Sequence, residues 1–97
     1  METKAIWKFG PISGHPVKVM GRPVAVNWQD NGQHGLYVWC EVDPEWANLG
    51  EDSDQVEWHW LKFVATGMEY VGKYVGTVYE VDTSGYQYVW HCIEVDQ

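Results

Sequence analysis

Residues 23–43 read PVAVNWQDNGQHGLYVWCEVD, and this stretch decides the expected fold. Pro23–Gln29 and Gly35–Asp43 are rich in β-branched and aromatic residues and alternate with a period of two, as β-strands do. Between them, Asp30-Asn31-Gly32 offers residue types that accept the positive φ angles of a tight turn. The stretch therefore predicts an antiparallel hairpin.

The same period of two continues on both sides of this hairpin, and no long segment keeps a helical period. Pro44–Asp54 is predicted as the one long loop, with a single helical turn over 44–49 before Gly50. The turn residues Asp82-Thr83-Ser84-Gly85 predict a second hairpin between the last two strands. The further strands are predicted at Ala5–Phe9, Val17–Met20, Val56–Ala65, Tyr74–Val81 and Tyr86–Val95. The chain is therefore expected to be mainly β: a small antiparallel sheet, a sandwich or a partly closed barrel of about six or seven strands.

A chain of 97 residues is expected to form one domain, residues 1–97, because two cores would each be too small to be stable. Seven Trp, six Tyr and two Phe indicate a folded chain, since disordered chains are poor in aromatic residues. The first residues lack the apolar core of a targeting signal, and no apolar run is long enough for a membrane span. Cys40 and Cys92 follow no CxxC spacing and are expected to be reduced, packed thiols.

The net charge is −8, and the acidic residues are concentrated in the middle of the chain. Four basic residues precede that region, and no further Lys or Arg follows until Lys62. The acidic run consists of Asp30, Glu41, Asp43, Glu45, Glu51, Asp52, Asp54 and Glu57. Such a field repels nucleic acid and attracts basic protein surfaces, so we expect no direct nucleic-acid binding.

Several predicted strands are apolar or aromatic on both faces. In residues 35–43, Val38 and Cys40 face one way while Tyr37 and Trp39 face the other. A 97-residue sheet cannot cover both faces alone, so one face must be closed by folding of the sheet on itself, by a second subunit or by a ligand. The rings are therefore either core and dimer interface, or part of a pocket or contact surface.

The sequence shows no recognisable catalytic machinery. Its four His lack metal-finger spacing and the HExxH pattern, and no Ser lies in a GxSxG elbow. His91 and Cys92 are neighbours in a strand and point to opposite faces, which disfavours a Cys–His nucleophile. His59 and His91 are expected to face similar surfaces, where a two-His site is conceivable. We predict a protein that binds without catalysis, with no cofactor and no metal.

Five segments together resemble a family of short, uncharacterised phage and bacterial proteins that is known as a domain of unknown function. The order and spacing of these segments cover nearly the whole chain, although Met68 stands where the family usually has His. The segments are Ala5-Ile6-Trp7-Lys8-Phe9, Leu36-Tyr37-Val38-Trp39 with Val42-Asp43-Pro44, Phe63-Val64-Ala65-Thr66-Gly67, Tyr74-Val75-Gly76-Thr77, and Val89-Trp90-His91-Cys92-Ile93-Glu94. The resemblance implies a compact β-rich fold and a phage or prophage setting, hence the cytoplasm of a bacterial host. It supplies no activity and no catalytic residues.

Three functions are compatible with these observations. The first is a counter-defence protein, expected to be a homo-oligomer, that sequesters a nucleotide-derived immune signal without turnover. Aromatic rings would then stack on bases and basic residues would meet phosphates. The residues for this role are Tyr37, Trp39, Trp58, Trp60 and Trp90, with Arg22 and Lys62. The second is an acidic inhibitor of a basic, nucleic-acid-binding host surface, using Glu45, Glu51, Asp52, Asp54 and Glu57. The third is a structural or accessory phage protein.

Overall fold

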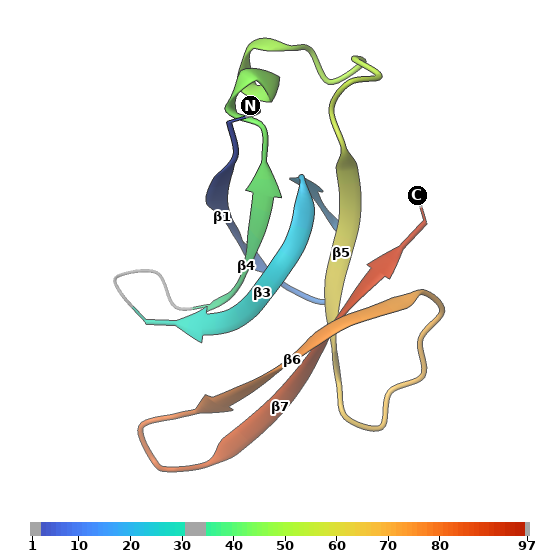
Figure 1. Cartoon of the computed structure of the whole chain (residues 1–97). Helices are drawn as coiled ribbons and strands as arrows, with labels where there is room; N and C mark the ends of the chain where they lie inside the picture. The colour runs from blue at the N-terminus through green and yellow to red at the C-terminus, as the bar shows by residue number, and fades with distance from the viewer. Residues whose placement is uncertain (1–2, 31–34, 97) are drawn as a thin grey trace.

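The computed structural model describes residues 3–30 and 35–96, in which seven strands form two antiparallel sheets (Figure 1). Sheet A has the order β1 (Ala5–Ile12), β4 (Gly35–Val42), β3 (Arg22–Gln29). Sheet B has the order β2 (Val17–Met20), β5 (Trp58–Ala65), β7 (Gln87–Val95), β6 (Lys73–Val81). The mainly β class is confirmed, and the described strands do not close into a barrel.

Both predicted hairpins are confirmed. β3 and β4 pair up to Gln29 opposite Gly35, and β6 and β7 pair up to Val81 opposite Gln87. Of the first predicted turn, Asn31 and Gly32 lie outside the described residues. The predicted helical turn is the 3-10 helix η1 (Pro44–Asn48), where the Asp43 carboxylate accepts from the Glu45 amide at 2.9 Å. No helix in the described part of the chain has the length and apolarity needed to cross a membrane.

Two strand boundaries differ from the prediction by more than one residue, and the others agree to within one residue. β1 was expected to stop at Phe9, but it continues to Ile12 through an irregular register between Phe9 and Ile12. A bulge of this kind lets a strand pass a proline, which offers no amide to the ladder. β5 begins at Trp58 rather than at Val56.

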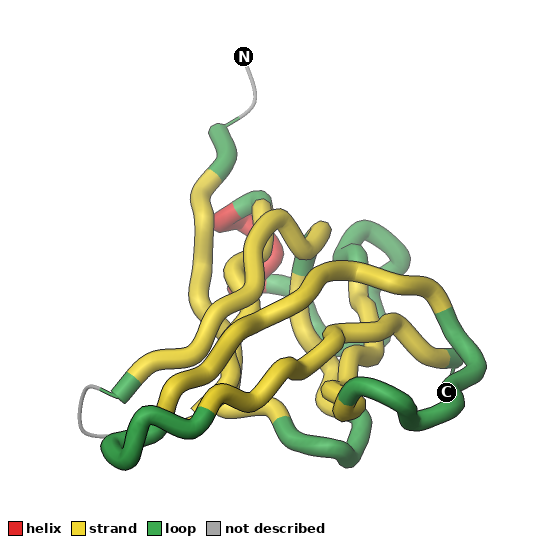
Figure 2. The backbone as a smooth tube through the Cα atoms, turned by 90° about the horizontal axis from the view of Figure 1, so that it is seen from below, coloured by secondary structure: helices red, strands yellow, loops and turns green. Residues whose placement is uncertain are grey.

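The core lies between the two sheets (Figure 2). From sheet A, β4 turns Leu36, Val38, Cys40 and Val42 inward, as their alternation predicts. From sheet B the core receives Val19, Leu61, Phe63, Val78 and Cys92. Burying a large apolar side chain contributes roughly 1.5–3 kcal/mol, so this inter-sheet layer is the main source of stability. The sequence left open whether an apolar sheet face is covered by the chain itself, by a second subunit or by a ligand. In the structure the chain folds on itself, so that each sheet covers the inner face of the other.

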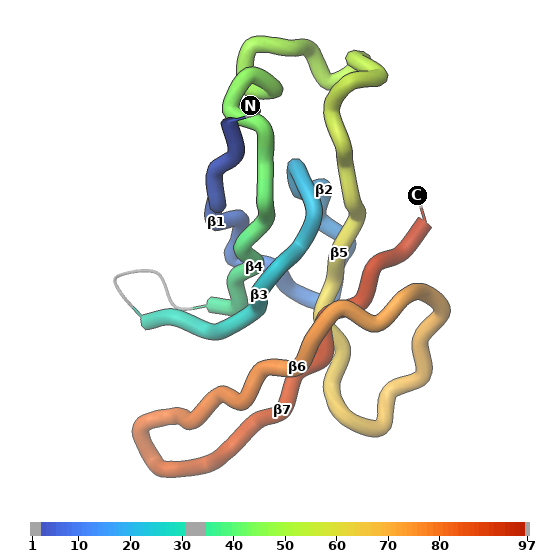
Figure 3. The backbone as a smooth tube through the Cα atoms, viewed as in Figure 1, coloured from blue at the N-terminus to red at the C-terminus, as the bar shows by residue number. Residues whose placement is uncertain are grey.

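The chain changes sheet at Gly21, between β2 in sheet B and β3 in sheet A (Figure 3). Gly21 has a φ of 90°, and a Cβ there would lie 2.3 Å from the carbonyl oxygen of Glu41. Its amide donates to the Glu57 carbonyl at 2.8 Å, which ties the corner to the segment that enters β5. The corner therefore requires both the left-handed backbone and the missing side chain.

Two substitutions separate these requirements. Gly85 also has a positive φ, but no atom lies within 4 Å of the place that a Cβ would occupy, so Gly85→Ala should cost only the conformational term of about 1 kcal/mol. Gly21→Ala adds a backbone clash and should lower the free energy of unfolding by about 3 kcal/mol or more. Urea denaturation followed by Trp fluorescence measures both. Equal losses in the two variants would show that the close approach at Gly21 is unimportant.

Candidate ligand-binding site

The seven residues predicted to bind a ligand lie in three different places. Strand register puts Tyr37, Trp39 and Arg22 on the outer face of sheet A, because Arg22 pairs with Glu41 beside them. Trp58, Trp60 and Lys62 lie together on the outer face of sheet B. Trp90 packs against the core between the sheets. The fold therefore separates the seven residues into two groups of three, one on each sheet, and Trp90.

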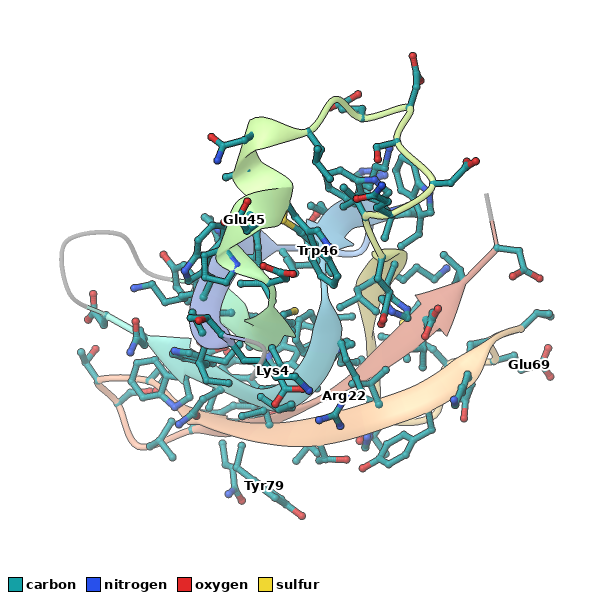
Figure 4. The ribbon with its side chains drawn as sticks, turned by 45° about the horizontal axis from the view of Figure 1, so that its top comes forward. Lys4, Arg22, Glu45, Trp46, Glu69 and Tyr79 are labelled. Atoms are coloured by element: carbon teal, nitrogen blue, oxygen red, sulfur yellow. The ribbon has the colours of Figure 1, made fainter. Side chains whose placement is uncertain are left out.

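The cationic side chains on the outer face of sheet A contact other side chains of the same chain. Arg22 and Lys4 lie side by side, and each donates to the same Glu41 oxygen at 3.4 Å (Figure 4). The hydrogen bond from Arg22, followed by the charge of Lys4, lowers the pKa of the Glu41 carboxyl. Tyr37 is only 4% exposed, and the Lys8 ammonium lies 4.8 Å from its ring centre. Arg22 is thus engaged by a carboxylate, and Tyr37 presents little surface to a ligand.

The outer face of sheet B carries a different set of side chains, which we call the Trp–Lys face: Lys18 and Met20 from β2, Trp58, Trp60, Lys62 and Val64 from β5, His91, Ile93 and Val95 from β7, and Tyr74, Thr77 and Tyr79 from β6. Lys18 pairs directly with Trp60, and its ammonium lies 4.4 Å from the Trp58 ring centre. Val64 and Ile93 are buried beneath the longer side chains. The Trp–Lys face therefore carries aromatic and cationic side chains around the buried, apolar Val64 and Ile93.

The charge of the Trp–Lys face differs from that of the chain. None of the twelve strand residues that form it is Asp or Glu, although the chain has a net charge of −8. Glu80 and Glu94 of the same sheet pair with Tyr88 and Leu61 and so point to the opposite face. At one end lies an open groove of about 670 Å³, lined by Lys62, Met68, Glu69, Tyr70 and Val71. Glu69 is the acidic residue among those that line this groove with Lys62.

Trp58 carries a polar atom with no partner. Its indole nitrogen is buried, and no hydrogen-bond acceptor reaches it within the described residues. A buried donor left unsatisfied costs about 1–3 kcal/mol, so such groups are rare and call for an explanation. An acceptor supplied by a ligand, with a small shift of the ring, would remove this cost.

His91 is fixed on the Trp–Lys face by a network of hydroxyl groups. Its Nε2 lies 2.8 Å from Thr66 Oγ1 and its Nδ1 lies 3.0 Å from Thr77 Oγ1. The Tyr74 hydroxyl lies 2.6 Å from the same Thr77 oxygen. No motif signals this network, because its residues come from β6, β7 and the segment after β5.

His59 lies on the core-facing side of sheet B, so the prediction that it shares a surface with His91 was wrong. His59 pairs with Val19, whereas His91 pairs with Val64 on the outer face. The Nδ1 of His59 lies 2.7 Å from Glu94 Oε2, and the Nε2 of His59 lies 2.6 Å from Glu57 Oε2. Within residues 3–30 and 35–96, no three His, Cys, Asp or Glu side chains form a group that would hold a metal ion.

The residues predicted for contact with a basic protein divide into two groups. Glu45, Glu51, Asp52 and Asp54 are exposed on η1 and the loop that follows it, at one end of the molecule (Figure 1). Glu57 instead forms the contact with His59 described above.

Cys40 and Cys92 are free and buried, and neither thiol is suited to nucleophilic chemistry. Burial is the main cause that raises the pKa of each thiol to about 12. Thiolates, the reactive form of cysteine, are therefore strongly disfavoured at both positions.

Comparison with protein-family models, with curated proteins and with solved structures finds no match for this chain. The family resemblance seen in the sequence stays a prediction. The function is accordingly argued from the geometry of the two sheets.

The His59 cluster predicts a pH-dependent stability. Burial lowers the pKa of His59, but the hydrogen bonds and charges of Glu57 and Glu94 outweigh it and raise the pKa above the ordinary value of 6.5. A raised pKa in the folded state stabilises the fold at low pH, and this stabilisation is lost as the pH rises through the folded-state pKa. Glu94→Gln should lower the His59 pKa measured by NMR, and should destabilise the protein more near pH 6 than near pH 9.

Glu45→Gln is the control, because Glu45 is an exposed acid of the preceding loop that makes no described contact with His59. It should leave the titration of His59 unchanged. A His59 pKa that is the same in the Glu94→Gln variant would contradict the assignment.

Proposed function

We propose that this chain is a non-catalytic protein that binds a small ligand with flat bases and phosphate groups on its Trp–Lys face. The ligand class is a nucleotide-derived signal of a host immune system, which the protein sequesters during phage infection. The observation that carries the proposal is that Trp58, Trp60, Lys18 and Lys62 share a face with no strand carboxylate, in an otherwise acidic chain.

The rings of Trp58 and Trp60 supply the stacking surface. Both rings are half-buried, so packing against neighbouring side chains limits their conformational freedom in the unbound protein and lowers the entropy lost on binding. Stacking of a base on an aromatic side chain is worth about 1–3 kcal/mol and depends little on the identity of the base. The unpartnered indole N–H of Trp58 adds a donor that a base or phosphate acceptor would satisfy.

Lys18 and Lys62 flank these rings and supply the positive charge. Lys18 pairs across the strands with Trp60, and Lys62 follows two residues after Trp60 on the same face. Phosphate groups placed between them would be held by charge-assisted hydrogen bonds, which are about twice as strong as neutral ones. Arg22, Tyr37, Trp39 and Trp90 lie elsewhere and take no part in this site.

The second candidate, an acidic inhibitor, is favoured by a separate observation. Glu45, Glu51, Asp52 and Asp54 are exposed together on η1 and the loop that follows it. Such a surface would be steered toward a basic groove, and high salt would weaken the association.

The test measures the affinity of cyclic dinucleotides, cyclic mononucleotides and ADP-ribose by titration calorimetry at fixed salt. One class should bind, and it should be recovered chemically unchanged after prolonged incubation. Lys62→Gln should weaken that binding about tenfold, since a charge-assisted hydrogen bond is worth about 1.5–3 kcal/mol. Glu69→Gln should strengthen binding, because it removes the carboxylate that lines the groove with Lys62.

Lys8→Gln is the matched control, because it removes the same charge from the outer face of sheet A. It should leave the affinity unchanged. Absence of binding by every compound, or an equal loss in Lys8→Gln and Lys62→Gln, would refute the proposal. Salt-sensitive capture of a basic complex that is lost in an Asp52→Asn, Asp54→Asn variant would favour the second candidate instead.

A further inference from the structure

The core-facing side of the β6–β7 hairpin carries a row of three aromatic rings: Tyr86, Tyr88 and Trp90. The ring centres of Tyr88 and Trp90 are 6.4 Å apart with planes only 17° from parallel. Those of Tyr86 and Tyr88 are 4.8 Å apart. Tyr86 is 62% exposed and Tyr88 41% exposed, so most of the row lies outside the core. An exposed row of this kind offers ring faces to a partner.

The row leads into a cleft of about 490 Å³ between the two sheets, where Trp90 forms part of the wall. This volume is within the range of roughly 300–1,000 Å³ found for small-molecule sites. The wall is mainly apolar and includes Pro11, Ile12, Leu36, Phe63 and Met68. The cleft thus lies on the opposite side of sheet B from the Trp–Lys face.

The described wall of this cleft contains an acidic residue. Glu80 is the charged side chain among its described lining residues, and its Oε1 accepts from the Trp90 indole N–H at 3.1 Å. Asp82 follows on the same hairpin, and hydrogen bonds led by the one from Ser84 lower the pKa of its carboxyl. The Glu80 carboxyl group thus lies in the cleft wall, and the Asp82 carboxylate lies beside the aromatic row.

We propose that this cleft binds an organic cation that has an apolar body. The apolar walls would take the body of the ligand. The face of the Trp90 ring attracts a positive charge through its quadrupole, and the Glu80 carboxyl group at the edge of that ring adds Coulombic attraction. An anion of the same shape would be repelled by Glu80, so this site and the nucleotide site select opposite charges. The inference goes beyond the proposed function and does not depend on it.

Three probes of one shape test the charge selection: phenylbutylammonium, phenylbutanol and phenylbutyrate. Titration calorimetry with the full chain should rank them in that order, with the ammonium about tenfold tighter than the alcohol, as expected for a cation–π contact of about 1–2 kcal/mol. Backbone NMR shifts on adding the ammonium should map to Trp90, Phe63 and Met68 of the cleft wall.

Glu80→Gln should remove most of the preference for the ammonium over the alcohol while keeping the apolar contribution. Gln at this position retains an oxygen that can accept from Trp90, so the variant is expected to fold. Glu45→Gln removes the same charge from the exposed end of the molecule and should leave the preference intact. The proposal is overturned if no probe binds, if all three bind equally, or if Glu80→Gln keeps the full preference.

Discussion

The packing of sheet A against sheet B is the constraint on which the rest of the structure depends. Val38, Cys40 and Val42 of β4 meet Leu61 and Cys92 of sheet B in one buried layer. Because the side-chain period of a strand is two, burying one set of alternate residues fixes which residues face outward. A slip of one residue in β4 would turn Tyr37, Trp39 and Glu41 into the core in place of Val38, Cys40 and Val42. The same layer therefore sets both stability and the composition of every surface.

Sheet B shows the consequence most clearly, because its two faces have opposite chemistry. The outer face holds Lys18, Lys62 and two tryptophans without a strand carboxylate. The inner face holds Glu80 in the cleft wall and Glu94, which pairs with Leu61 of β5 and Lys73 of β6. On these grounds we propose an anion-binding surface on the outer side of sheet B and a cation-binding cleft on its inner side.

Polar clusters at the sheet edges add order that apolar packing alone does not give. His59 joins the start of β5 to Glu94 near the end of β7, and Glu57 holds its second ring nitrogen. His91 joins β7 to Thr77 of β6 and to Thr66 after β5. Both rings have each nitrogen engaged, which limits their rotation and aligns the strands that carry them. Glu57, in the segment before β5, makes two of these contacts: its carbonyl accepts from the Gly21 amide, and its side chain contacts His59.

The sequence by itself determined the β class, both hairpins, the helical turn after Asp43 and the inward set of β4, because these follow from local periodicity and turn chemistry. It also indicated that aromatic residues on both faces need cover. It did not determine which aromatic residues meet, since that depends on strand order and on the register between strands far apart in sequence. The alternation of β5 by itself predicts that Trp58, Trp60 and Lys62 share a face, but only the register between strands places Lys18 beside Trp60, Arg22 beside Glu41 and Trp90 in the cleft wall. Only the tertiary structure decided these neighbours, because β2, β5 and β7 pair across long separations that no local pattern encodes.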